Sequence, residues 1–136
     1  MKKEILISTD IKQSVQKIWN YWTEPDHIIK WNFASDDWCC PSAENDLVAG
    51  GKYNARMEAK DGSFGFDFEA VYDEIIEHEK ITYTLADGRK VTTTFEKLNG
   101  TTKVTTVFDA ESENPIEMQR DGWQAILNNF KKYVES

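Results

Sequence analysis

The sequence predicts an α+β fold in which a curved antiparallel sheet packs against a long C-terminal helix. Three observations support this: a side-chain period of two through most of residues 51–108, turn signals that divide this stretch into strands, and an apolar stripe at helical spacing from residue 116 onward. A sheet with one apolar face must cover that face, and the last helix is the only expected element long enough to do so. Because a twisted sheet does not close perfectly against one helix, we expect a ligand cavity between them.

The first part of the chain predicts one strand and two short helices. Residues 3–9 are rich in β-branched side chains, which favour a strand. Ser14 is a candidate N-cap for a helix over residues 15–22, where apolar side chains follow at helical spacing. Pro25 suits the first position of a second short helix, because its missing N–H costs nothing there.

Residues 32–49 show no regular period, and we expect a loop over them. A loop of this length without regular structure is uncommon unless it serves a function. This one contains Phe33 and Trp38, together with the acidic pair Asp36 and Asp37. The aromatic side chains indicate a flap over a binding site.

From Gly51 on, alternating side chains predict an antiparallel meander with one buried face. Hairpin turns are expected at residues 61–63, 87–88 and 99–100. The charged side chains of the alternation should face water: Arg56, Glu58, Asp67, Glu69, Lys90 and Glu96. The opposite, inward series is Tyr53, Ala55, Met57, Phe64, Phe66, Phe68, Ala70, Tyr72, Ile81, Tyr83, Leu85, Val91, Thr93, Phe95, Val104, Thr106 and Phe108.

A strong helix start precedes the last amphipathic segment. Asn114 is the expected cap, Pro115 the first helical residue, and Glu117 the residue that closes a capping box. Gly122 costs up to ~1 kcal/mol within a helix relative to Ala. We therefore expect the helix to approach the sheet or a ligand closely at Gly122.

Length, charge and hydropathy limit the classes of function. A chain of 136 residues fits one domain, over residues 1–136. The net charge of −8 disfavours nucleic acid and anionic membrane surfaces as partners. No stretch approaches the ~20 apolar residues of a membrane span, nor the roughly 7–15 of a secretory signal. We expect a cytoplasmic location.

The sequence favours neither a metal site nor a cofactor. Its two cysteines, Cys39 and Cys40, are neighbours, and a disulfide between adjacent residues is strained. His27 and His78 are the only histidines, so a four-ligand zinc site is not expected. Two ordinary thiols in a loop are the main interpretation, and a redox role is the alternative.

A family likeness is carried by Pro25 to Trp31, by Gly50-Gly51-Lys52-Tyr53, by Gly88 and by Gly122-Trp123. Through these residues the chain resembles the START-like (SRPBCC) superfamily over about residues 5–135. Within it, the chain is most similar to homologues of the C-terminal domain that activates the heat-shock chaperone ATPase. The resemblance implies the helix-grip (START/Bet v-like) fold, with a cavity that binds lipids, polyketides, hormones or other apolar molecules. Some relatives are cyclases or co-chaperones.

The period of two and the helical stripe together predict the ligand-binding residues. Phe95 on the sheet and Phe130 on the helix share the inward face and are also expected in the cavity wall. The alternative is that all these side chains form a solid core. Three aromatic residues before the sheet would form the mouth of the cavity. The predicted binding residues are Trp31, Phe33 and Trp38 at the mouth, Tyr53, Met57, Phe66, Phe68, Tyr83, Thr93 and Thr106 on the sheet, and Gln119, Trp123 and Leu127 on the helix.

Three functions follow from these residues and from the resemblance. The first is binding of a small hydrophobic or amphipathic molecule. The second is a co-chaperone that docks on a heat-shock ATPase. The third is a cyclase- or hydrolase-type enzyme, although the sequence contains no nucleophile elbow, phosphate loop or metal-ligand spacing. The ionisable residues that could reach the mouth are Asp36, Asp37, Arg120 and His27. The alternatives are a loop turn in which the Asp36 and Asp37 carboxylates cap backbone amides, and a surface position for His27.

Overall fold

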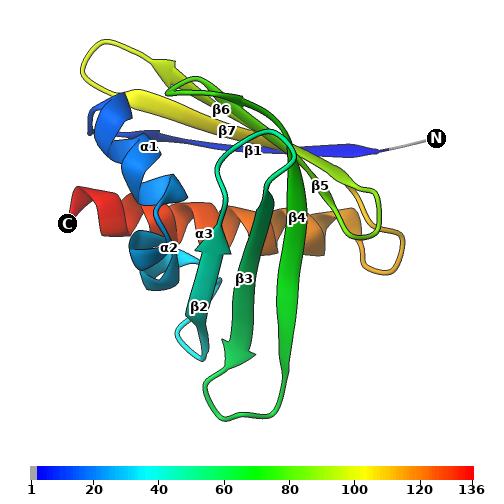
Figure 1. Ribbon diagram of the computed structural model, residues 1–136. Coiled ribbons are helices and arrows are strands. Elements are labelled where there is room, and N and C mark those ends of the chain that lie inside the picture. Colours follow the sequence, from blue (N-terminus) through cyan, green and yellow to red (C-terminus); the bar gives the residue numbers. More distant parts are fainter. Residues whose placement is uncertain (1–2) are drawn as a thin grey trace.

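The computed structural model describes residues 3–136 and shows a seven-stranded antiparallel sheet curved around one long helix (Figure 1). The strand order is β1-β7-β6-β5-β4-β3-β2. The elements are β1 (Glu4–Ile11), α1 (Val15–Thr23), α2 (Pro25–Trp31), β2 (Trp38–Asn45), β3 (Lys52–Ala59), β4 (Gly65–Ile76), β5 (Lys80–Leu85), β6 (Lys90–Lys97), β7 (Thr102–Asp109) and α3 (Ile116–Glu135). The predicted α+β helix-grip fold is confirmed.

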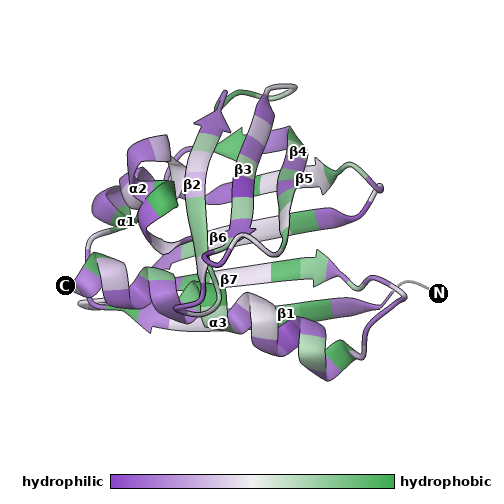
Figure 2. Cartoon of the chain, turned by 90° about the horizontal axis from the view of Figure 1, so that it is seen from below, coloured by the Kyte–Doolittle hydropathy of each residue, from purple (hydrophilic) through white to green (hydrophobic). Residues whose placement is uncertain are grey.

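The first strand lies beside the last one and widens the sheet against which α3 packs. β1 pairs with β7 along its whole length, from Glu4 opposite Asp109 to Ile11 opposite Thr102. Strands β3 to β7 form the predicted meander, each pairing with the next. Hydrophilic and hydrophobic residues alternate along the strands (Figure 2). The apolar side chains therefore gather between the sheet and α3, where Phe108 and Phe130 are fully buried.

The two short helices form as the sequence predicts. The Oγ of Ser14 accepts a hydrogen bond from the Lys17 amide at 3.2 Å, which caps the first turn of α1. Pro25 occupies the first turn of α2. Trp19 of α1 packs edge-on against Phe95 of β6, with ring centroids 5.4 Å apart. This contact joins the helical layer to the sheet.

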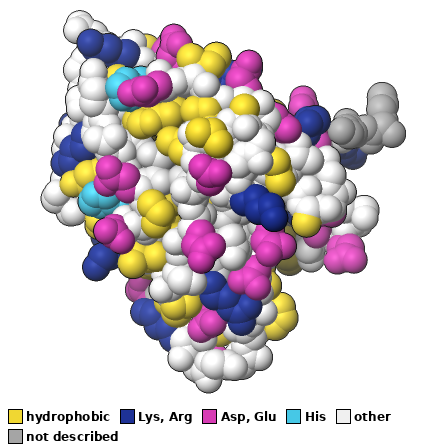
Figure 3. All heavy atoms as spheres, viewed as in Figure 1, with side chains coloured by type: hydrophobic (Ala, Val, Ile, Leu, Met, Phe, Trp, Pro, Cys, Tyr) yellow, Lys and Arg dark blue, Asp and Glu magenta, His cyan; other side chains and the backbone are white. Residues whose placement is uncertain are grey.

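The outward face of the sheet carries the charged side chains, as predicted. The Nε of Arg56 lies 2.9 Å from a carboxylate oxygen of Glu58, and its Nη1 lies 3.6 Å from Asp67. On the face of the molecule shown in Figure 3, acidic side chains are spread among basic and apolar ones. Within residues 3–136, no helix is long and apolar enough to cross a membrane.

The loop predicted over residues 32–49 is wrong for residues 38–45, which form the edge strand β2. Its register with β3 shifts between Cys39 and Ser42. The shift interrupts the period of two, and Pro41 removes a hydrogen-bond donor, which an edge strand tolerates. Both thiols are free, with Cys40 buried and Cys39 half-buried. They therefore belong to a strand and not to a loop.

The predicted capping box at the start of α3 is also wrong. Pro115 occupies the N-cap position and provides no side-chain cap. The Asn114 side chain instead donates to the carboxylate of Glu111 at 3.2 Å. The close approach to the sheet expected at Gly122 is likewise wrong, because a Cβ built on Gly122 meets no atom within 4 Å.

The turn between β4 and β5 has no counterpart among the predicted turns. The alternation predicts a strand up to Tyr72, whereas β4 continues to Ile76 after a register shift between Tyr72 and Glu74. His78 in the following turn has φ of 65°, the left-handed region. Since no glycine marks this turn, the sequence shows no turn signal there.

Candidate ligand-binding cavity

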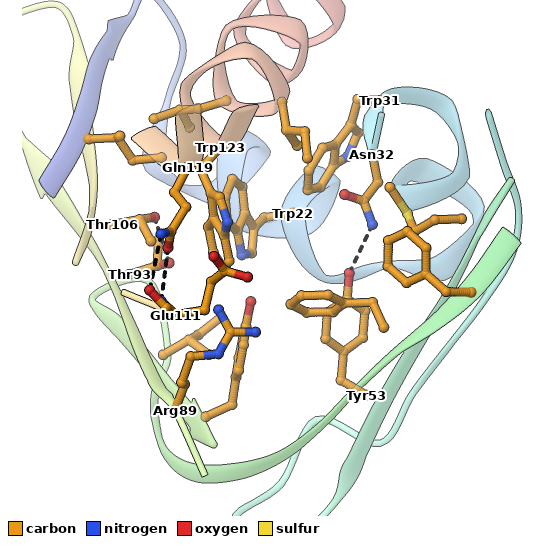
Figure 4. Close-up of a pocket in the computed structure, with 18 of the residues that line it drawn as sticks. Trp22, Trp31, Asn32, Tyr53, Arg89, Thr93, Thr106, Glu111, Gln119 and Trp123 are labelled. Carbon is orange, nitrogen blue, oxygen red and sulfur yellow. Dashed lines mark hydrogen bonds between the residues drawn. The ribbon is translucent and has the colours of Figure 1, made fainter. Parts of the chain in front are cut away.

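A cavity of about 350 Å³ lies between the concave face of the sheet and α3. Its walls come from strand β1, strands β3 to β7 and helices α1 to α3, and from two turns at one end (Figure 4). The residues that line it are Ile7, Trp22, Trp31, Asn32, Tyr53, Met57, Phe66, Phe68, Tyr72, Ile81, Tyr83, Arg89, Thr93, Thr106, Glu111, Asn114, Gln119, Trp123, Ile126 and Leu127.

Aromatic rings form much of the wall and support one another. Trp22 of α1 stacks on Trp31 of α2, with centroids 5.0 Å apart. On the other side of the cavity, Phe68 of β4 meets Trp123 of α3 edge-on at 6.1 Å and Tyr83 of β5 at 6.2 Å. These ring contacts hold the side chains of the wall in place without filling the cavity.

Few polar groups interrupt this apolar surface. The hydroxyls of Thr93 and Thr106 form a buried hydrogen bond of 2.8 Å across β6 and β7. The amide of Asn32 donates to the hydroxyl of Tyr53 at 3.3 Å. Burial raises the pKa of the Tyr53 and Tyr83 hydroxyls above the ordinary range. These phenols are therefore neutral at physiological pH and can donate a hydrogen bond to a ligand.

Two charged residues, Arg89 and Glu111, line one end of the cavity. Arg89 lies in the β5–β6 turn, and Glu111 lies between β7 and α3. All other residues that line the cavity are uncharged at neutral pH. Within residues 3–136, no three His, Cys, Asp or Glu side chains are grouped closely enough to hold a metal ion.

The structure brings together all the residues predicted to form the cavity except Phe33, Trp38, Phe95 and Phe130. Phe33 lines a separate pocket beside α3, together with Asp36 and Lys132. Trp38 lies on β2 and packs against Phe64, with centroids 6.0 Å apart. Phe95 and Phe130 are buried core residues outside the cavity wall.

The expectation that Asp36, Asp37, Arg120 and His27 reach the mouth is wrong, because none of them lines the cavity. The ring of His27 stacks on Tyr21 and its Nδ1 lies 2.8 Å from the hydroxyl of Tyr133. Asp37 accepts a hydrogen bond from the hydroxyl of Ser35. These contacts turn both side chains toward local neighbours on the surface.

Sequence reasoning did not identify several lining residues. Tyr72 and Ile81 share the inward parity of the predicted wall, so the period of two could have identified them. Arg89 and Glu111 lie in turns, where no periodicity reports which way a side chain points. The full set that was missed is Ile7, Trp22, Asn32, Tyr72, Ile81, Arg89, Glu111, Asn114 and Ile126.

Comparison with known structures supports the fold and gives the family. An AHSA1-like protein from Aeromonas hydrophila is 41% identical, covers 98% of this chain and 92% of its own, and superposes with a TM-score of 0.93. A Cytophaga hutchinsonii protein is 48% identical, with 97% and 92% covered and a TM-score of 0.85. A Chromobacterium violaceum protein with 22% identity shares the fold, with 98% and 99% covered and a TM-score of 0.88.

No curated protein matches the chain significantly. The family described as activator of Hsp90 ATPase homolog 1-like protein matches residues 12–135, from the end of β1 to the end of α3. That match spans the helices, the meander and every wall of the cavity except the one from β1. The chain therefore belongs to the activator of Hsp90 ATPase homolog 1-like family.

Proposed function

We propose that the protein binds a small hydrophobic or amphipathic molecule in the cavity between the sheet and α3. The proposal is carried by a cavity of about 350 Å³ with aromatic walls and few polar groups. Small-molecule sites commonly have volumes of about 300–1,000 Å³ and this mixture of lining groups. The family resemblance favours lipids and polyketides as ligand classes.

The first test is a panel of fatty acids, polyketides and the dye ANS, screened by the shift in melting temperature. A ligand that binds only the folded protein stabilises it by about 2.7 kcal/mol when the free ligand concentration is about 100 times its Kd. We expect at least one class to raise the melting temperature. If no ligand does so and ANS fluorescence is unchanged, the binding function is wrong.

A cavity-filling variant locates the binding. Ile126 lines the cavity, so Ile126→Trp should place additional ring atoms inside it and weaken binding by tenfold or more, equivalent to about 1.4 kcal/mol. Met118 lies on the same helix and is 60% exposed, so Met118→Trp is the matched control. Equal affinities of the two variants would place the ligand elsewhere.

The family description favours a second candidate, which is interaction with Hsp90 and stimulation of its ATPase. The measurement is the Hsp90 ATPase rate with and without this protein, together with a pull-down. An unchanged rate and no association would remove this candidate.

A cyclase- or hydrolase-type activity is a third candidate, and the presence of the charged residues Arg89 and Glu111 in the cavity is the observation that favours it. It requires that a molecule co-purified with the protein is turned over, and that Glu111→Gln abolishes the turnover.

We also expect the protein to act in the cytoplasm, in keeping with its acidic composition and two free thiols. Fractionation of the source cells would test this location.

A further inference from the structure

One end of the cavity has a different chemistry from the rest. Arg89 and Glu111, of opposite charge, are the two charged residues that line it. Figure 4 shows the guanidinium of Arg89 and the carboxylate of Glu111 directed toward the same end of the cavity. A ligand that fills the aromatic part must therefore present its polar end to a hydrogen-bond donor and an acceptor at once.

Arg89 is fixed by a local contact that leaves part of its guanidinium available. Its Nε lies 2.7 Å from Oδ2 of Asp87, and its backbone N–H donates to Oδ1 of Asp87 at 3.1 Å. Its side chain is 27% exposed. The contact through Nε leaves the two terminal amino groups, which can donate side by side to one acceptor.

Glu111 is fixed in the same way from the opposite loop. Its carboxylate accepts the backbone N–H of Asn114 at 2.6 Å and the Asn114 side-chain amide at 3.2 Å. Its own backbone N–H donates to the side chain of Gln119 at 2.9 Å, and its carbonyl accepts from Gln119 at 3.2 Å. A carboxylate has about four acceptor sites, so capacity for a ligand donor remains.

Among residues 3–136, the ion-pair partner of Arg89 is Asp87 and not Glu111. Each of the two charged groups that line this end is therefore held by its own neighbour, Arg89 by Asp87 and Glu111 by Asn114. A ligand that covers this end must offer hydrogen-bond partners to both groups, because it is costly for a charged group to lose its solvent without a replacement partner.

The opposite charges at this end of the cavity disfavour a ligand whose polar end carries a single net charge. An anionic group would pair with Arg89 but would lie close to the carboxylates of Glu111 and Asp87. A cationic group would pair with Glu111 but would face the guanidinium of Arg89. Like charges brought together at this partly exposed end repel one another, less strongly than in a dry interior. A neutral group that carries an acceptor beside a donor satisfies both residues and introduces no like charge.

We propose that the ligand has an apolar, aromatic-compatible body and a neutral amide-type end, whose carbonyl accepts from Arg89 and whose N–H donates to Glu111. This inference rests on the proposed binding function and adds the polar chemistry of the ligand. It makes Arg89 and Glu111 the residues that determine specificity, while the aromatic walls contribute affinity.

The test uses three probes with the same two-ring body: naphthylacetamide, naphthylacetate and naphthylethylamine. Their Kd values are measured by calorimetry at neutral pH. We expect the amide to bind about tenfold more tightly than either charged probe, since like-charge contacts cost at least about 1.4 kcal/mol. Equal affinities of the three probes would overturn the proposal and leave the binding function intact.

Two variants that each remove one charge should relieve the repulsion of opposite probes. Glu111→Gln should strengthen naphthylacetate binding and weaken amide binding, whereas Arg89→Met should strengthen naphthylethylamine binding. The exposed neighbours supply matched controls, Glu113→Gln and Lys90→Gln, which should change none of the affinities. The melting temperature of each variant verifies folding. If each cavity variant changes the affinities for all three probes equally, specificity does not come from Arg89 and Glu111. If none of the probes binds and the lipid and polyketide panel is also negative, the binding function itself fails.

Discussion

The ring of Trp123 on α3 lies parallel to the ring of Phe108 on β7, with centroids 4.0 Å apart and an interplanar angle of 11°. Phe108 is 1% exposed, while Trp123 is half-buried and lines the cavity. One stacked pair therefore joins the helix to the sheet and forms a boundary of the cavity. Fold stability and cavity shape are coupled at this contact.

Truncation at this contact should destabilise the protein substantially. We expect Trp123→Ala to lower the free energy of unfolding by ~3 kcal/mol, because it removes a large packed ring next to an existing cavity. The measurement is urea denaturation followed by circular dichroism. Met118→Ala, at an exposed site on the same helix, should change stability by less than about 0.5 kcal/mol. An effect of Trp123→Ala no larger than that control would contradict the role assigned to the stacked pair.

The buried threonine pair should show strong coupling. Thr93→Val leaves the Thr106 hydroxyl without its partner at 2.8 Å, and Thr106→Val does the reverse. Each single variant should cost about 1–3 kcal/mol, and the double variant less than the sum of the two. Thr82→Val and Thr92→Val provide the control, since this second hydroxyl pair at 3.3 Å is less buried. Strict additivity at Thr93 and Thr106 would show that their hydrogen bond adds no stability.

Stability should fall at alkaline pH because buried acidic groups resist ionisation. Burial raises the pKa of the Cys40 thiol from 9.0 to about 11. Between these values the unfolded chain releases the proton while the folded chain retains it, so the free energy of unfolding decreases as pH rises from about 9 to about 11. Burial raises the pKa of Tyr72 and Tyr83 in the same direction, which steepens the loss above about pH 10. Denaturation midpoints across this range measure the slope.

The variant Cys40→Ala should reduce this alkaline slope between about pH 9 and pH 11, because it removes one of the groups that titrate. Cys39→Ala removes the half-buried neighbour and is the matched control. Identical slopes for the wild type and Cys40→Ala would show that the Cys40 thiol is not protected from ionisation in the folded state.

The two neighbouring thiols should differ in reactivity. Cys40 is 3% exposed and its pKa is raised, so little of the nucleophilic thiolate is present near neutral pH. Cys39 is more accessible. Iodoacetamide should therefore modify Cys39 first, as mass spectrometry of the peptides would show. In urea the two cysteines should react at similar rates. Equal modification rates of Cys39 and Cys40 in the native state would contradict the burial of Cys40.

The elements with a clear period were predictable, and those without one were not. Helix α1 and its Ser14 cap follow from local spacing, as does the inward face of β3 through Tyr53 and Met57. β2 was missed because its bulge and Pro41 remove the alternation on which strand prediction depends. The start of α3 was misassigned because Asn114 has a second partner, Glu111, and sequence spacing does not show which one its side chain takes.

The sequence by itself determined the fold class and most of the cavity wall, because a period of two fixes which strand side chains share a face and a helical period fixes the stripe of α3. Only the tertiary structure decided that the enclosed space remains open and that Arg89 and Glu111 line the same end of it. Both residues lie in turns that are distant in sequence. Their positions depend on how far the sheet bends around α3, and this curvature is a property of the whole assembled sheet.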